Sequence, residues 1–96
     1  MSNAEELRER TKKFAIRIVR LLKALPKATE AQVIGKQLLR SGTSVGANYR
    51  AVCRARSKAE FMARLGVVAE EADESVFWLE ILEETKIFNA KQLMRF

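Results

Sequence analysis

Apolar residues recur at alternating spacings of three and four over most of this chain, which is the period of an amphipathic helix. The first run ends at Leu25, because Pro26 disfavours helical geometry in the residue before it. With one proline and four glycines, the chain has little scope for a turn-rich β fold. We predict a single all-α domain over residues 1–96, a helical bundle. Its helices are expected at about 4–25, 29–54, 57–86 and 90–96.

Three predicted helix starts carry a residue whose side chain can accept hydrogen bonds from free backbone N–H groups. Thr29 with Gln32, and Ser57 with Glu60, have the three-residue spacing of a capping box. Asn89 is expected to cap the last helix, which has room for barely two turns. Either the given sequence is truncated, or the fourth helix is rudimentary.

The second predicted helix contains an unusual run of small residues. Gly42 and Gly46 each cost about 1 kcal/mol relative to alanine in a helix interior, so we expect a neighbouring backbone to pack closely there. Gly-Thr-Ser-Val-Gly lacks the lysine and the spacing of a phosphate-binding P-loop. Both faces of this helix are patterned. One presents Ile34, Leu38, Ser41, Val45, Val52 and either Asn48 or Tyr49, and the other presents Arg40, Thr43, Ala47, Arg50 and Arg54.

Two stripes run along the third predicted helix. The first is apolar and is expected to face the core: Phe61, Leu65, Val68, Ala72, Val76 and Leu79. The second mixes apolar and acidic residues: Val67, Glu71, Glu74, Trp78 and Ile81. Because unpaired carboxylates in an apolar stripe are costly, we predict structural ion pairs from Glu71 and Glu74 to Arg40, Arg50 and Arg54. Val67, Trp78 and Ile81 lie off the core stripe, where a monomer would expose them, and this predicts an oligomer interface.

Charge is distributed unevenly around a formal net charge of +6. Residues 1–27 carry eight basic and three acidic side chains, whereas residues 57–86 carry three basic and eight acidic ones. This asymmetry indicates either an anionic partner or neutralisation of the basic helices by the acidic one. On the first helix a basic stripe lies beside the apolar face, and it is either a solvated face or a binding surface. Its members are Arg10, Lys13, Arg17 and Arg20.

Residue types needed for most catalysis are missing. The chain has no histidine, and its single cysteine, Cys53, allows no internal disulfide. Glu70, Glu71, Asp73 and Glu74 are closely spaced, but carboxylate metal sites in helical bundles also use histidine. We therefore expect no enzyme, no cofactor and no metal site. The chain also lacks a signal peptide and the roughly 18 apolar residues of a membrane span, so we expect a cytoplasmic protein with no membrane contact.

Three segments occur in order and together resemble a known family: QLLRSGTSVGANYR at residues 37–50, RARSKAEF at 54–61 and EEADESVFWLEIL at 70–82. They resemble the bacterial four-helix-bundle family encoded by intervening sequences of 23S ribosomal RNA, over roughly residues 10–96. The bundle is also similar to the accessory variability determinant of diversity-generating retroelements, a basic protein that works with a reverse transcriptase and RNA. The resemblance implies an up-down four-helix bundle, a ring-shaped homopentamer and no enzymatic activity. Family members usually carry a full fourth helix, and in this chain it is short or truncated.

Two functional hypotheses follow. The first is a non-enzymatic oligomeric scaffold that binds the RNA or DNA backbone in a ribonucleoprotein context. Its phosphate contacts would be the basic stripe of the first helix, which lacks interleaved aromatic residues, so that binding would be sequence-independent and salt-sensitive. The alternative is a protein–protein assembly module with no nucleic-acid binding, whose basic faces form ion pairs between subunits.

Overall fold

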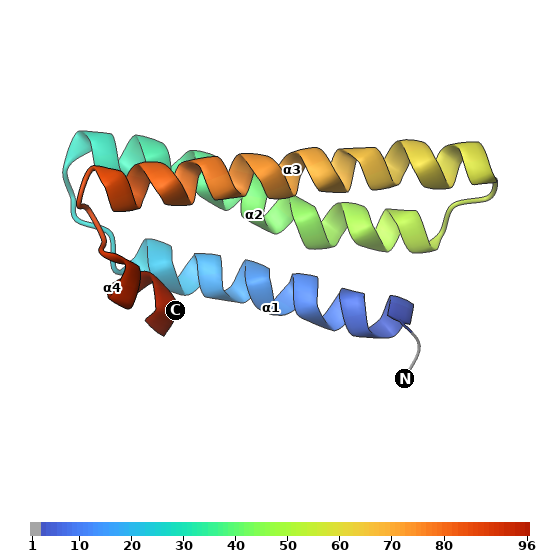
Figure 1. The fold of residues 1–96 in the computed structure, drawn as a ribbon, viewed down its shortest axis with the longest axis horizontal. Coiled ribbons are helices and arrows are strands. Elements are labelled where there is room, and N and C mark those ends of the chain that lie inside the picture. Colours follow the sequence, from blue (N-terminus) through green and yellow to red (C-terminus); the bar gives the residue numbers. More distant parts are fainter. Residues whose placement is uncertain (1–2) are drawn as a thin grey trace.

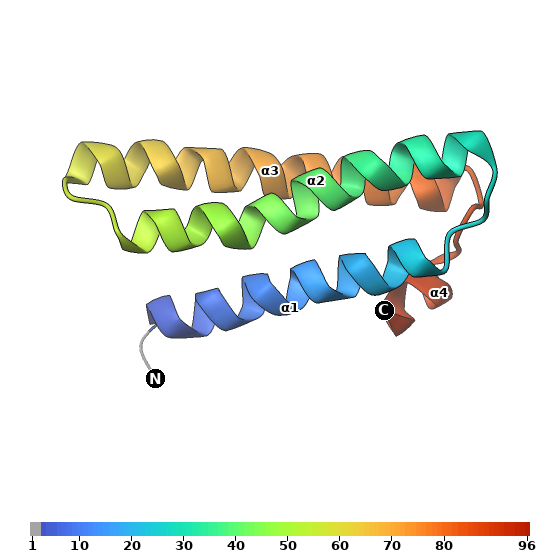
Figure 2. The same ribbon diagram turned by 180° about the vertical axis from the view of Figure 1, so that it is seen from behind.

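The computed structural model describes residues 3–96, so residues 1 and 2 of the predicted domain lie outside the described part. Within it the chain forms four helices and no strand: α1 (Asn3–Lys23), α2 (Thr29–Cys53), α3 (Lys58–Glu84) and α4 (Ala90–Arg95). The first three run alternately up and down, and α4 lies beneath the C-terminal end of α1 (Figures 1 and 2). The prediction of an all-α four-helix fold with a short fourth helix is confirmed.

The central helix is α2, because the packing between helices is concentrated in the α1–α2 and α2–α3 pairs. Ile18 and Leu21 of α1, Leu38 of α2 and Leu82 of α3 form one buried cluster, which Phe88 completes. α1 carries Glu5 and Glu6 in its first turn and Arg20 and Lys23 in its last, which suits the helix dipole. The core therefore lies where α1 and α3 meet opposite sides of α2.

Two glycines set the distance between α1 and α2. A Cβ atom added at Gly42 would lie 2.9 Å from Cγ1 of Ile18, and one added at Gly46 would lie 3.3 Å from the backbone oxygen of Thr11. Both distances are shorter than an ordinary van der Waals contact between carbon and its neighbours. The predicted close helix crossing at these glycines is confirmed, and it accounts for two residues that weaken an isolated helix.

Local side-chain caps fix two of the helix starts. The Ser57 hydroxyl accepts a 3.0 Å hydrogen bond from the Glu60 N–H, and the Asn89 side chain accepts one from the Gln92 N–H, so both caps are confirmed. The Glu60 carboxylate accepts from the N–H of Arg56 and not from that of Ser57, whereas Asn89 and Gln92 form a full capping box that was not predicted. The prediction that Thr29 caps α2 is wrong. The N-cap position is taken by Ala28, so that Thr29 is already inside the first turn and makes no cap hydrogen bond.

A residue in the left-handed backbone conformation ends α3 and turns the chain back towards α1. Lys86 has a φ of 63°, a conformation that commonly ends a helix. The N–H of Phe88 can then donate to the carbonyl of Leu82 at 3.1 Å. The Phe88 side chain is 5% exposed and contacts Phe96 edge to face, with ring centroids 5.4 Å apart. This anchor holds α4 against α1 and α3 instead of letting α3 continue.

The predicted core stripe of α3 is wrong for half of its members. Phe61, Leu65 and Val76 are exposed, and the buried residues of α3 are Ser75 and Leu82. At one end of this stripe Leu79 lines an apolar pocket together with Leu93 of α4 and the C-terminal Phe96. Because α4 is only six residues long, it covers that end and leaves the rest of the stripe uncovered.

Candidate functional site

Carboxylates of α3 meet one arginine of α2. Arg40 Nη1 lies 3.2 Å from Glu71 Oε2, and Arg40 Nη2 donates to Glu74 Oε2. Trp78 Nε1 also donates to Glu74, at 3.0 Å, and nearby the Ser41 and Ser75 hydroxyls lie 3.0 Å apart in the buried interface. At this point the positive charge of α2 and the negative charges of α3 neutralise each other within one chain. We call these ion pairs the Arg40 corner.

The predicted pairs of Arg50 and Arg54 with these glutamates are wrong. Arg50 comes ten residues after Arg40, a step that turns it by about 80° around the helix, towards α1. Arg54 comes 14 residues after Arg40, which places it about 21 Å from Arg40 along the axis of α2. There it lines a pocket with Arg56, Glu60 and Arg64, and Glu60 is paired with Arg64 at 2.9 Å. Neither arginine forms an ion pair within residues 3–96.

The basic stripe of α1 lies on the outside of the molecule. All four side chains are exposed, and none forms an ion pair with any residue from Asn3 to Phe96. Arg17 also borders an apolar pocket of about 160 Å³ beside Phe14, Leu79 and Phe96. The stripe is therefore available to meet an anion from solvent. Its members are Arg10, Lys13, Arg17 and Arg20.

The residues predicted to form an oligomer interface are only partly exposed. Val67 is 42% exposed, but Trp78 and Ile81 are half-buried, and Trp78 packs against the core cluster. The expectation that a monomer would expose Trp78 and Ile81 is wrong, because their side of α3 turns towards α2. Other large apolar side chains of α3 do reach solvent. They are Phe61, Met62, Leu65, Val76 and Phe77.

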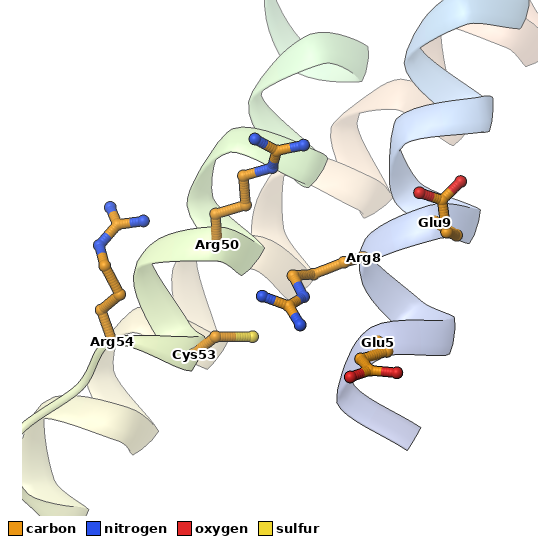
Figure 3. A pocket seen from close by; sticks show the side chains of 6 residues that line it. All are labelled: Glu5, Arg8, Glu9, Arg50, Cys53 and Arg54. Carbon is orange, nitrogen blue, oxygen red and sulfur yellow. The ribbon is translucent and has the colours of Figure 1, made fainter. Parts of the chain in front are cut away.

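A polar cleft between the N-terminal half of α1 and the C-terminal half of α2 was not predicted from the sequence. Its larger part has a volume of about 590 Å³. The lining residues are Glu5, Arg8, Glu9, Arg50, Cys53 and Arg54 (Figure 3). A smaller part continues along the helices past the glycine crossing. Its lining residues are Arg8, Lys12, Ala15, Thr43, Gly46, Ala47 and Arg50. We call the two parts together the α1–α2 cleft.

The register of the crossing could have revealed this cleft. Gly46 packs on Thr11, so a residue one turn before Thr11 must lie level with a residue one turn after Gly46, because the helices are antiparallel. Those residues are Arg8 and Arg50, which both parts of the cleft share. Sequence periodicity assigned each arginine to a face but gave no register between the two helices.

Tyr49 is a buried residue of α2, one position before the cleft residue Arg50. Burial raises the pKa of Tyr49, the neighbouring Cys53 thiol raises it further, and the positive charge of Arg8 acts in the opposite direction. Arg8 is therefore close enough to Tyr49 for its charge to be felt at the phenol.

Neither a metal site nor a membrane span is found in the described chain. Among residues 3–96 no three histidine, cysteine, aspartate or glutamate side chains are grouped as a metal would require. No helix in this part of the chain combines the length and apolar character needed to cross a membrane. What the described helices offer is a pattern of paired and unpaired cations.

The fold defines a class: an all-α bundle of antiparallel helices organised around α2, with a short C-terminal helix. The chain belongs to the family of 23S rRNA-intervening sequence proteins, which it matches over residues 5–96. This confirms the resemblance drawn from the three segments. It is also similar to the crystal structure of a protein of unknown function from the S23 ribosomal protein family of Bacteroides thetaiotaomicron VPI-5482. The two share 37% identity with a TM-score of 0.88, over 98% of this chain and 84% of that one.

The comparison with curated proteins finds no match. Neither the family description nor the description of that crystal structure points to catalysis.

Proposed function

We propose that this protein is a non-enzymatic, homo-oligomeric scaffold that binds the phosphate backbone of RNA or DNA in a cytoplasmic ribonucleoprotein. The observation that carries the proposal is the difference between two sets of cations. Arg40 is neutralised by Glu71 and Glu74, whereas the basic stripe of α1 is exposed and forms no ion pair within the described chain.

Internal neutralisation was the competing explanation for the basic first half of the chain. It accounts for Arg40 and, within α3, for Arg64. It does not account for the basic stripe of α1, because Glu71 and Glu74 of α3 are already paired with Arg40. The members of that stripe are Arg10, Lys13, Arg17 and Arg20. A stripe of unpaired cations attracts a polyanion and releases its counterions on binding. The association of the family with 23S rRNA in its description is in keeping with such a partner.

The test compares the wild type with the double variant Arg17→Ala/Arg20→Ala. Exposed charges contribute within about 0.5 kcal/mol to the free energy of unfolding, so melting should be nearly unchanged. Binding to a labelled single-stranded RNA, measured by fluorescence anisotropy at about 50 and about 200 mM salt, should weaken. The slope against salt should decrease by about 0.7 for each phosphate that is no longer neutralised. If the variant binds RNA as the wild type does, the stripe is not the binding surface.

A second candidate function is a protein–protein assembly module, which the exposed apolar side chains of α3 favour. Phe61 is 42% exposed and Met62 58% exposed, and exposed apolar surface is a feature of interaction sites when it is contiguous. Light scattering would give the mass of the wild type, for which the family resemblance predicts a pentamer. Leu65→Glu should lower that mass while circular dichroism stays helical. A protein that stays monomeric at tens of micromolar would contradict both assembly and the pentamer.

A further inference from the structure

We propose that the α1–α2 cleft holds phosphate groups of the bound nucleic-acid strand, gripped by Arg8 and Lys12 from one helix and by Arg50 and Arg54 from the other. This inference rests on the proposed function. It adds a second phosphate-binding surface, on a different side of α1 from the basic stripe and built from residues of two helices.

The first argument is convergence. Arg8 extends from α1 across the gap to end beside Cys53, and Arg50 extends from α2 above it (Figure 3). Both arginines line the two parts of the cleft, so the parts lie next to each other along the helices. Lys12 lies at one end of this track and Arg54 at the other. A strand lying in the cleft would meet cationic groups near its centre and towards both ends.

The second argument is charge balance. Four cations line the cleft, against the two carboxylates of Glu5 and Glu9. Figure 3 shows the Glu9 carboxylate turned away from the Arg8 guanidinium. None of the four cations is within ion-pair distance of a carboxylate in residues 3–96, while Arg40 and Arg64 elsewhere in the chain are paired. An anion entering the cleft would offset this excess of positive charge.

The third argument is the chemistry of the lining. Guanidinium groups donate two parallel N–H bonds to phosphate oxygens, which makes arginine the preferred residue for this anion. The floor near the crossing is made of small residues, Ala15, Gly46 and Ala47, so a sugar–phosphate backbone can approach closely. Among the described residues no aromatic ring lines either part of the cleft, which disfavours the base stacking that single-strand binding domains use. The ligand class is therefore a phosphate backbone, contacted without reading its bases.

The experiment uses the intact chain and two matched double variants, each of which removes two positive charges. Arg8→Ala/Arg50→Ala empties the centre of the cleft, and Lys91→Ala/Arg95→Ala removes two exposed cations from α4 as the control. Anisotropy with a single-stranded RNA of about 16 nucleotides is measured at several salt concentrations. We expect the cleft variant to bind at least about tenfold more weakly than the control, with a salt slope lower by about 1.4 because two phosphates are no longer neutralised. Thermal melting followed by circular dichroism verifies that both variants are folded.

A second measurement uses inorganic pyrophosphate as the probe, followed by NMR of the arginine Nε–H groups. We expect the wild-type resonances of Arg8, Arg50 and Arg54 to shift, and those of Arg40 to stay in place. This measurement does not depend on nucleic acid. Compared with the RNA titration, it therefore distinguishes a backbone phosphate from a free phosphate as the ligand.

The outcomes divide the two proposals. If the cleft variant binds RNA no more weakly than the control, the cleft inference is wrong, and the Arg17→Ala/Arg20→Ala variant alone decides the proposed function. If the wild type binds no RNA but pyrophosphate shifts the three cleft arginines, the proposed function fails and the phosphate site stands with a free phosphate as its ligand. If the wild type binds no RNA and pyrophosphate leaves the resonances of the three cleft arginines in place, both proposals are overturned.

Discussion

The two sides of α2 are built on different principles. Towards α1 the contact is made by glycines: Gly42 leaves room for the Ile18 side chain, and Gly46 packs against the backbone of Thr11. Towards α3 the contact is polar, with the Ser41–Ser75 pair buried and Arg40 bound to Glu71 and Glu74 at the rim. The same helix thus uses close approach on one side and polar pairing on the other.

The two sides also differ in which arginines remain available. On the α1 side, Glu5 and Glu9 line the same cleft as Arg8 and Arg50, but neither arginine forms an ion pair among residues 3–96. On the α3 side, Glu71 and Glu74 reach Arg40 and pair with it. Which arginines stay unpaired therefore depends on which carboxylates the neighbouring helix brings within reach, and it cannot be read from charge counts alone.

The largest expected effect comes from breaking the glycine side. Gly42→Leu places a branched side chain where a Cβ atom alone would already lie 2.9 Å from Ile18. Overpacking of this kind typically lowers the free energy of unfolding by about 1–3 kcal/mol. Chemical denaturation followed by circular dichroism measures it.

Gly66 provides the control for this prediction, because a Cβ atom there would meet nothing within 4 Å. Gly66→Ala should raise stability by up to about 1 kcal/mol through helix propensity. Equal effects at Gly42 and Gly66 would show that the crossing is not close.

A smaller effect is expected from the polar side, and it differs between two arginines of α2. Arg40→Ala removes both ion pairs of a corner whose side chains are 49%, 21% and 35% exposed. Because solvent screens these pairs, the loss should be at most about 1 kcal/mol. Arg50→Ala removes an exposed charge with no ion pair in the described chain, and should change the free energy of unfolding by less than about 0.5 kcal/mol. A larger loss at Arg50 than at Arg40 would reverse the assignment of paired and free cations.

The smallest expected effect is a dependence of the free energy of unfolding on pH, through Tyr49 on α2 near Arg8 of α1. Because burial raises the pKa of Tyr49, the folded protein keeps this proton to higher pH than the unfolded chain does. The stability that this contributes is complete below about pH 10, the ordinary tyrosine pKa, and is lost as pH rises through the folded value. Ultraviolet absorbance titration measures it directly, since the chain has one tyrosine.

Arg8→Ala sharpens this prediction. Arg8 lowers the pKa of Tyr49, so its removal should raise the tyrosine midpoint further, whereas Arg40→Ala should leave it in place. An unchanged midpoint in Arg8→Ala would place Arg8 outside the cleft.

The sequence predicted well what depends on neighbours along the chain. Ser57 and Asn89 cap their helices because the accepting side chain and the donating N–H are three residues apart. Gly42 and Gly46 were informative because a helix tolerates them only for a packing reason. Thr29 failed because its residue type suits a cap, but the N-cap lies one position earlier, at Ala28.

What depends on other helices was predicted less well. The third helix has two stripes of helical period, and choosing the core stripe required knowing that α4 covers only the end beside Leu79. Arg40, Arg50 and Arg54 were assigned to one face of the helix, yet their partners depend on a turn of about 80° between the first two and on their level along α3. The α1–α2 cleft needed the register between two helices, which periodicity within each helix does not contain.

The central position of α2 also has a consequence for how the chain assembles. The single tryptophan, Trp78, lies at the α2–α3 contact, and the single tyrosine, Tyr49, lies on α2 near Arg8 of α1. Each interface therefore contains its own intrinsic chromophore, and refolding can be followed at both without labels. α2 and α3 are joined by a short connection and form a local hairpin, whose formation closes only small loops. Tryptophan fluorescence should recover no later than the tyrosine signal, with α1 docking as the step that buries Gly42 and Gly46.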